Sequence, residues 1–156
     1  MKELLINPAK TCAVTGHRVL PYNFDKERLK KRLEQIVNIG YDTFMVGMAL
    51  GFDTECFKAL EKIREKTPIK IIACIPCVSQ ADRFNKIQKA EYERMIDCAD
   101  EKVYVSIEYD NYCMMKRNKY MVDRSSLVLY YLTRDYGGTK KTVDYAVKKG
   151  IMVLKY

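Results

Sequence analysis

Residues 11–18 read TCAVTGHR, in which residues 11–15 are an apolar run of strand length that ends at Gly16. Such a run, bounded by a turn signal, is typical of a strand that is buried on both faces of a parallel sheet. The same pattern returns along the chain, where short apolar strands end in turns and amphipathic helices follow. This alternation predicts a Rossmann-like three-layer α/β fold, with a mainly parallel sheet and helices on both of its faces.

The expected elements alternate over the whole chain. We expect strands over residues 11–15, 43–46, 70–75, 102–107, 127–132 and 151–154, and helices over residues 25–39, 53–66, 80–99, 112–124 and 140–149. The first helix shows the pattern most clearly, because Leu29, Leu33 and Ile36 recur at helical spacing and either Asn23 or Asp25 can cap its start. No linker, low-complexity tract or repeat divides residues 1–156, so we expect one domain.

The composition narrows the class of partner. The net charge of +8 favours anionic partners, namely nucleic acid, phosphates or an acidic protein. No apolar run approaches the ~18 residues of a membrane span, so we expect no membrane partner. Residues 1–8, MKELLINP, do not resemble a signal peptide, and the six cysteines lie mostly in apolar segments as buried, reduced thiols. These features predict a cytoplasmic protein.

The residues that follow the strands are the first candidates for a binding site, because ligands of open α/β sheets bind outside the carboxyl ends of the strands. Those segments are residues 15–18, residues 47–53, Pro76 and residues 136–139. Glycines in such turns let the backbone approach a ligand, and the N–H groups at the start of the next helix can bind an anion. The turn at residues 137–139 is the strongest candidate for binding an anion, and Thr139 is expected to cap a helix that begins at Lys140. The alternative is an ordinary glycine turn with a capping threonine that binds no ligand.

Two side chains near these turns have two interpretations each. Arg117 shares a helix face with Met121 and Arg124, so its stem is partly buried. Its guanidinium group either reaches solvent or binds an anion in a bidentate manner. His17, the single histidine, either donates to a phosphate and acts as an acid or base, or only lines and caps its turn.

Three further patterns are weaker signals. Cys74 and Cys77 have the CxPC shape of a redox pair, and we favour the alternative of two buried thiols. No second CxxC or HxxxH pair is present, so no metal site is predicted. The twelve tyrosines could stack on the bases of single-stranded nucleic acid, but we favour packing at the edge of the core.

Four segments resemble motifs of the SLOG superfamily, which includes the Smf DNA-processing proteins and the Lonely Guy phosphoribohydrolases. Residues 14–18, VTGHR, are similar to the VTG[HY]R opening of its YpsA-like bacterial branch. Residues 46–53, VGMALGFD, resemble the SGxAxGxD turn of the DNA-processing branch, and residues 117–121, RNKYM, resemble its RNxxM/I helix. Residues 137–142, GGTKKT, resemble the GGT segment that closes the site. The similarity runs from Cys12 to Leu154, with the motifs in the family's order.

The resemblance implies one pocket for a phosphate-bearing nucleotide or nucleotide-derived ligand, for example one related to ADP-ribose, and no resident cofactor. The resemblance implies that the phosphate is cradled by Gly137, Gly138 and Thr139 and is clamped by Arg117. It implies that the nucleoside side of the pocket is lined by Thr15, Gly16 and Gly47, and that the ribose hydroxyls donate to Asp53 or Asp123. The other expected ligand residues are His17, Arg18, Met48, Gly51, Pro76, Asn118 and Thr142. Because SLOG relatives often form dimers, the resemblance also implies a homodimer.

One departure from the family separates the functional hypotheses. The phosphoribohydrolases carry PGGxGTxxE, in which the glutamate serves the cleavage of the N-glycosidic bond, whereas residues 136–144 read YGGTKKTVD. We therefore expect a sensor or binding module. The first alternative is a phosphoribohydrolase-like enzyme in which Asp53, Asp123 or Asp144 acts on the sugar, with no residue assigned as catalytic. The second, less favoured alternative is single-stranded nucleic-acid binding, by analogy with the DNA-processing branch and from the positive charge.

Overall fold

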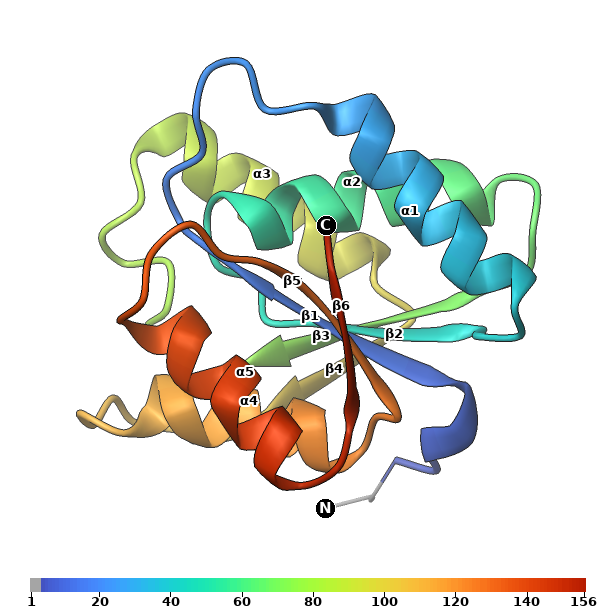
Figure 1. Cartoon of the computed structure of the whole chain (residues 1–156). Coiled ribbons are helices and arrows are strands. Elements are labelled where there is room, and N and C mark those ends of the chain that lie inside the picture. Colours follow the sequence, from blue (N-terminus) through green and yellow to red (C-terminus); the bar gives the residue numbers. More distant parts are fainter. Residues whose placement is uncertain (1–3) are drawn as a thin grey trace.

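A parallel sheet forms the middle layer of the computed structural model, which describes residues 4–156 (Figure 1). After a 3-10 helix at Pro8–Lys10, the elements in chain order are β1 (Thr11–Gly16), α1 (Lys26–Asn38), β2 (Thr43–Val46), α2 (Phe52–Arg64), β3 (Lys70–Ile75), α3 (Lys86–Cys98), β4 (Glu101–Tyr104), α4 (Cys113–Asp123), β5 (Leu127–Tyr131), α5 (Gly138–Lys148) and β6 (Met152–Lys155). The expected Rossmann-like α/β fold is confirmed. Residues 1–3 of the segment tested above for a signal peptide lie outside the described residues.

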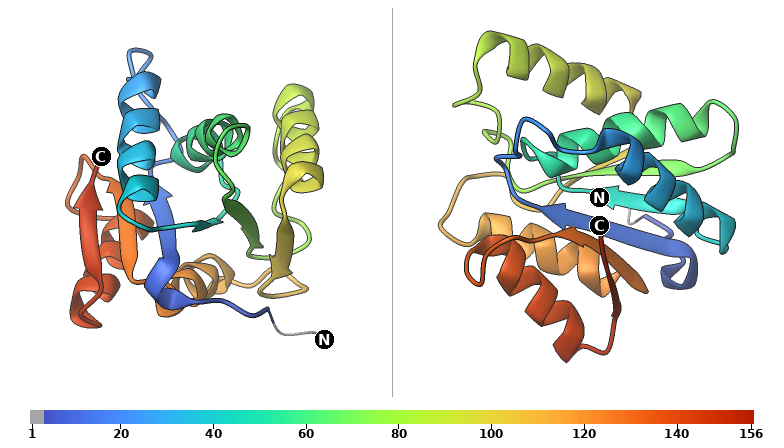
Figure 2. Two further views of the ribbon diagram at one scale, coloured as in Figure 1. Left: turned by 90° about the vertical axis from the view of Figure 1, so that its right-hand side faces the viewer. Right: turned by 45° about the horizontal axis from the view of Figure 1, so that its top comes forward.

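The helices cover both faces of the sheet. Helices α1, α2 and α3 lie on one face, and α4 and α5 lie on the other (Figure 2). Successive residues of a strand point to opposite faces. Accordingly, Cys12 and Val14 of β1 join the core under α1–α3, whereas Ala13 joins the core that contains residues of α4 and α5. The apolar run at residues 11–15 is buried throughout because it meets a helix layer on both sides.

The strand order places a crevice at the end of β1. The order is β4-β3-β2-β1-β5-β6, and every pairing is parallel, for example Ala13 with Met45 of β2 and with Val128 of β5. The chain moves outward from β1 through β2, β3 and β4, and then returns to the other side of β1 for β5. The carboxyl ends of β1 and β5 therefore flank the point where the order reverses, which is where ligands of doubly wound sheets bind.

Most of the expected boundaries agree with the structure to within two residues, and three expectations are wrong. The helix expected over 80–99 begins only at Lys86, because Asn85 and Gln88 form a reciprocal capping box that sets its start. The strand expected over 102–107 is shorter, because its ladder with β3 ends where Ile75 pairs with Tyr104. The third concerns α5, which begins at Gly138 with Gly137 as its N-cap, so that Thr139 lies inside the helix and does not cap it.

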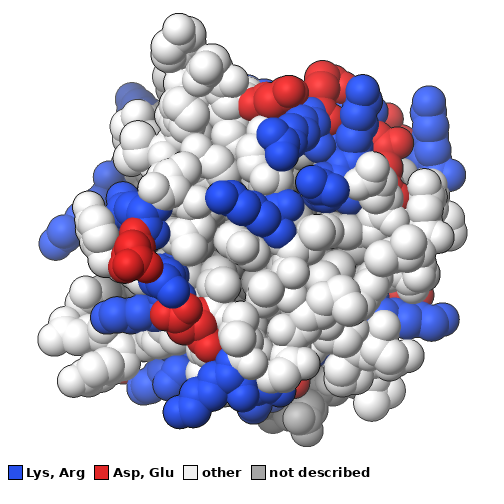
Figure 3. Space-filling view, in the orientation of Figure 1, with Lys and Arg blue, Asp and Glu red and all other residues white. Residues whose placement is uncertain are grey.

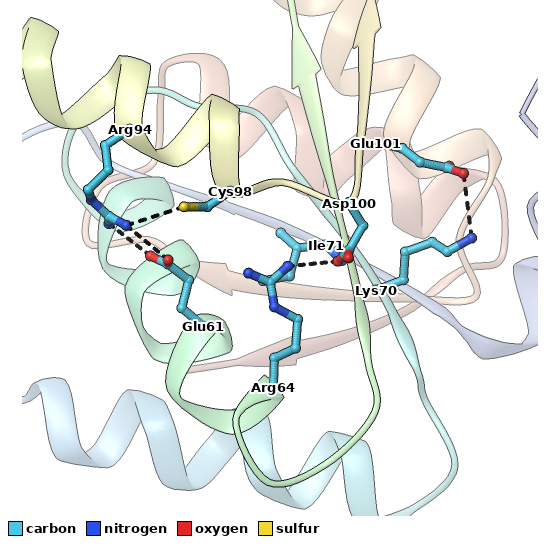
Figure 4. A network of polar contacts seen from close by, with 8 residues as sticks. All are labelled: Glu61, Arg64, Lys70, Ile71, Arg94, Cys98, Asp100 and Glu101. Atoms are coloured by element: carbon cyan, nitrogen blue, oxygen red, sulfur yellow. Dashed lines mark hydrogen bonds and ion pairs between the residues drawn. The ribbon is translucent and has the colours of Figure 1, made fainter.

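A polar network fixes the edge of the sheet that lies opposite the crevice (Figure 4). The carboxylate of Asp100 accepts from Arg64 of α2 and from the backbone N–H of Ile71, each at 2.8 Å. On the neighbouring helix, Arg94 forms a two-nitrogen contact with Glu61 at 2.8 and 2.9 Å. These contacts join α2, α3 and the start of β3, and they neutralise acidic and basic groups against one another at the amino ends of the strands.

At the start of α1, Asp25 is the cap, since its carboxylate accepts from the N–H of Arg28 at 2.9 Å.

In the part of the chain that the structure describes, no helix has the length and apolar character needed to cross a membrane.

Gly51 is required at the start of α2 for two reasons, and a substitution separates them. Its φ is +80°, and a Cβ atom would lie 2.5 Å from the carbonyl oxygen of His17 and still closer to that of Arg18. We predict that Gly51→Ala lowers the free energy of unfolding by at least about 3 kcal/mol, because backbone strain and a clash with backbone atoms add.

The matched control is Gly150→Ala. Gly150 has a similar φ of +76° but no atom within 4 Å of a Cβ position, so only the strain of about 1 kcal/mol applies. Urea unfolding of both variants measures the difference, and equal losses would show that the close approach at Gly51 has no energetic weight.

Candidate functional site

A cavity of about 430 Å³ opens at the carboxyl ends of β1 and β5, at the crevice described above. We call it the inner pocket. Its lining residues are Thr15, Gly16, His17, Arg18, Val19, Ala49, Asp53, Met114, Arg117, Asn118, Arg134, Gly138 and Thr139. The structure thus brings together segments from the ends of β1 and β2, from α4 and from the start of α5, as the four motifs predicted.

Arg117 forms part of the wall of the inner pocket from α4. The residue is only 4% exposed. Its Nη1 donates to the carbonyl oxygen of Gly47, and its Nε donates to Oδ1 of Asn118 at 2.8 Å. A Cβ on Gly47 would lie 2.8 Å from the guanidinium carbon, so glycine is needed for this approach. The interpretation that placed the guanidinium group in solvent is wrong, because the group is fixed inside the fold and borders the cavity.

Asp53 supplies a carboxylate with one oxygen free. It lies in the first turn of α2 and is 6% exposed. Its Oδ2 accepts from the N–H of Ala49 at 3.2 Å, whereas its Oδ1 is buried with no hydrogen-bond partner. Burial raises the pKa of Asp53 to about 6, although the charges of Arg117 and Arg18 and the hydrogen bond from Ala49 act in the opposite direction. The carboxylate therefore has one oxygen, Oδ1, without a donor, and the group titrates close to neutral pH.

His17 fits the second of its two interpretations, that of a side chain that fixes a turn. Its Nε2 accepts from the backbone N–H of Thr133 at 2.9 Å, and its ring meets Tyr131 edge-on at 5.6 Å. Burial lowers the pKa of His17, and the charge of Arg134 lowers it further, so the neutral form that can accept is favoured. The Nε2 atom is thus engaged in joining the end of β1 to the loop that leads into α5.

The start of α5 presents backbone donors to the inner pocket. The first N–H groups of a helix have no partner within it, and no side chain caps α5. Gly138 and Thr139 both line the cavity. Thr142, one turn further on, donates to the carbonyl of Gly138 at 2.8 Å and accepts from Nδ2 of Asn118 at 2.9 Å. This pair of contacts fixes the start of α5 against the helix that carries Arg117.

The charge of the inner pocket is positive. Arg18 and Arg134 line it along with Arg117, and Asp53 is the acid among its lining residues. Arg18 and Arg134 are exposed, and neither forms an ion pair with another residue of the described 4–156 range; Arg134 lies over the ring of Tyr136 at 5.1 Å. Three guanidinium groups around one carboxylate favour an anionic ligand.

Several predicted site residues do not line the inner pocket. Gly47 contacts Arg117, Thr142 contacts the start of α5, and Gly51 and Gly137 are the N-caps of α2 and α5. Two further ones are Pro76, which follows β3, and Met48, which is buried with a left-handed φ of +64°.

Two acids of the enzyme hypothesis lie outside the inner pocket. The structure does not bring Asp123 to it: this residue ends α4 and accepts from Tyr145 at 2.7 Å and from Lys149 at 2.8 Å. Asp144 pairs with Lys140 at 2.6 Å and is also absent from the lining. Asp53 is the member of the three that borders the cavity.

Three lining residues, Val19, Met114 and Arg134, lie outside the segments expected to form the site, and Ala49 lies within residues 47–53 without having been singled out. Arg134 is the most informative of them because it is charged. Its signal in the sequence is its place in the short loop between β5 and the glycine turn of α5, which is at the carboxyl end of a strand.

The CxPC motif gives two thiols with different surroundings. Cys74 is buried in the core on the α4 and α5 side of the sheet, and burial raises its pKa to about 12. Cys77 instead has its sulfur 4.0 Å from that of Cys113 and 3.6 Å from Oγ of Ser79. A redox pair needs a thiolate that forms easily, which the environment of Cys74 opposes. Among the described residues, no group of three or more His, Cys, Asp or Glu side chains could hold a metal ion.

Comparison with known proteins gives consistent results. Residues 14–151 match the model of the YspA SLOG family. The uncharacterized SPbeta prophage-derived protein YoqJ of Bacillus subtilis (strain 168) is 32% identical over 119 residues, which are 67% of this chain and 69% of that protein.

Two solved structures share the fold. One is the X-ray structure of DNA processing protein A (DprA) from Streptococcus pneumoniae, with a TM-score of 0.68 and 17% identity over 94% of this chain. The other is DNA processing protein A from Helicobacter pylori, described for its single-stranded DNA binding mode, with a TM-score of 0.66 and 18% identity over 96% of this chain. The chain spans 50% of the first protein and 65% of the second.

The raised pKa of Asp53 predicts a stability that depends on pH. Because the folded state keeps its proton up to about pH 6, against 3.8 for the unperturbed group, folding is penalised as the pH rises between these values. The penalty is absent below about pH 4 and fully present above about pH 6, where it amounts to about 3 kcal/mol. We predict that Asp53→Asn gains about this much stability relative to the wild type between pH 4 and pH 7.5.

Urea unfolding at the two pH values measures this gain. The control is Asp97→Asn, which changes an exposed acid on α3. A difference between Asp53→Asn and the wild type that stays the same at both pH values would contradict the assignment.

Proposed function

Since the chain belongs to the YspA SLOG family, we propose that it binds a phosphate-bearing, nucleotide-derived small molecule in the inner pocket, as a sensor or binding module. The observation that carries the proposal is the buried guanidinium group of Arg117 beside the uncapped start of α5. A helix N-terminus and an arginine that meet at one cavity are two independent reasons for a phosphate to bind there.

The remaining groups fit the other parts of such a ligand. Arg18 and Arg134 lie at the border of the cavity, where further phosphate oxygens could be neutralised. Asp53 is the acid among the lining residues, and its carboxylate can accept from a sugar hydroxyl. The volume of about 430 Å³ falls in the usual range for small-molecule sites. The proposal therefore places phosphate at α5 and the sugar near α2.

An enzymatic role would depend on Asp53. Burial brings its pKa to about 6, which is close to the value that suits a general acid or base at neutral pH. Asp144 is paired with Lys140 outside the cavity, so it does not replace the glutamate of the phosphoribohydrolases in this arrangement. Release of free base from a nucleotide, lost in Asp53→Asn, would support this second candidate.

Single-stranded nucleic acid is the other candidate, supported by the net charge of +8. Figure 3 shows a face on which basic side chains are mixed with acidic ones, beside a broad uncharged area. We place this candidate behind the small molecule because Arg117 and the start of α5 border a cavity of the size usual for small-molecule sites. A cytoplasmic location and a homodimer stay predictions that accompany the proposal.

We predict that a nucleotide ligand raises the melting temperature of the wild type but not that of Arg117→Ala. A ligand at a hundred times its Kd adds about 2.7 kcal/mol to stability, which is roughly 5–10 °C for a chain of this size. The measurement is a thermal-shift screen of nucleotides, nucleotide sugars and cyclic dinucleotides. Arg134→Ala changes an exposed arginine and should weaken the shift even if Arg117→Ala folds poorly.

The control is Arg124→Ala, on the same helix as Arg117. Its guanidinium group lies over the ring of Tyr120 at 3.6 Å and does not line the inner pocket, so the shift should persist. No shift with any compound would refute the small-molecule proposal. Binding of oligonucleotides that weakens steeply with added salt would then favour the nucleic-acid candidate.

A further inference from the structure

A second hollow continues from the inner pocket. It has a volume of about 420 Å³, and we call it the outer hollow. A narrow hollow of about 70 Å³ lies next to both. Arg18 and Met114 line all three, so the hollows adjoin one another between the end of β1 and the end of β3. A ligand that extends from the inner pocket into the outer hollow would pass these two side chains.

The outer hollow offers the groups that bind a second nucleotide unit. Tyr109 is 63% exposed, and Phe84 meets the ring of Tyr92 edge-on at 5.6 Å, which holds its orientation. Both rings line the hollow, as do Arg83 and Arg18. Aromatic rings beside arginines form a surface on which a base stacks while its phosphate is neutralised.

The two arginines of the outer hollow are available for a ligand. Arg83 and Arg18 are both exposed, and within residues 4–156 neither one takes part in a hydrogen bond through its side chain or in an ion pair. Asp82 is the acid that lines this hollow. The charge of the outer hollow therefore favours an anion, as does that of the inner pocket.

One carbonyl group connects the walls of the two compartments. The oxygen of Gly47 accepts from Nη1 of Arg117 in the inner pocket and from Nε2 of Gln80, which lines the outer hollow, at 3.1 Å. The amide of Gln80 also accepts from the hydroxyl of Tyr92 at 3.0 Å. The spacing between the compartments is thus set by these hydrogen bonds, which suits a ligand of defined length.

We propose that the ligand has two nucleotide-sized parts joined through phosphate. One part lies in the inner pocket, the base of the other lies against Phe84 and Tyr109, and the joining phosphates lie between the start of α5 and Arg18, which line the same cavity. This inference rests on the proposed function, since it assigns the second half of the ligand whose first half binds at Arg117. It names the class of that ligand: a free dinucleotide whose two halves are linked by a pyrophosphate group.

The test compares AMP with diadenosine diphosphate by isothermal titration calorimetry. We expect the two-base compound to bind the wild type at least about 10-fold more tightly. We expect Tyr109→Ala and Arg83→Ala to lose most of this gain while their affinity for AMP stays unchanged, because both residues line only the outer hollow. The matched control is Tyr112→Ala, an exposed tyrosine of the same loop that lines none of the three hollows, in which the gain should persist.

The outcomes separate the two proposals. If AMP binds in an Arg117-dependent way and the second base adds nothing, or if the gain survives both outer variants, the inference fails while the proposed function stands. If neither compound binds, both fail. A third arm uses a thymidine dodecamer: tight binding of this strand without binding of the free dinucleotide would overturn the inference in favour of nucleic acid.

Discussion

The contact between the guanidinium group of Arg117 and the carbonyl of Gly47 is the constraint on which the rest of the site depends. It requires a glycine at the end of β2, because a side chain there would occupy the place of the guanidinium group. It fixes α4 against the sheet, and Asn118, Thr142 and the start of α5 follow from α4 through successive hydrogen bonds. A buried cation is costly unless it is hydrogen-bonded, so this region of the fold is organised around satisfying one side chain.

The fold could be predicted from the sequence because its signals are local. Residues 70–75 form an apolar run, and Leu29, Leu33 and Ile36 recur at helical spacing, so the sequence itself indicates which faces of these elements are buried. The strand boundaries agree well where the chain turns at a glycine or a proline. The start of α3 was missed although Asn85 and Gln88 have the spacing of a capping box. Residues 80–85 precede that box, and the side chain of Gln80 donates to the carbonyl group of Gly47 at the end of β2.

The site could be predicted in part, and the errors have physical reasons. Arg117 and Gly138, which the motifs pointed to, both line the inner pocket because they lie on regular elements near the carboxyl ends of the strands. Asp123 was a candidate on the same helix as Arg117, but six residues advance about 9 Å along a helix and turn it to another face. Arg134 and Tyr109 lie in irregular loops, where no periodicity tells which way a side chain points. The joining of separate hollows into one groove depends on tertiary distances that a sequence does not state.

The pairing of β1 with β5 has a consequence for the order in which the protein acquires its site. The hydrogen bond from Thr133 to His17 joins residues 116 positions apart, and the inner pocket lies at this junction. Closing so long a segment is entropically costly, and non-local parallel pairing is slow to form. A nascent chain that has completed β1 to β4 already holds Asp53 and Arg18 but not the walls that α4 and α5 provide. The inner pocket is therefore among the last features to appear during synthesis, and a ligand bound there would report that β1 has paired with β5.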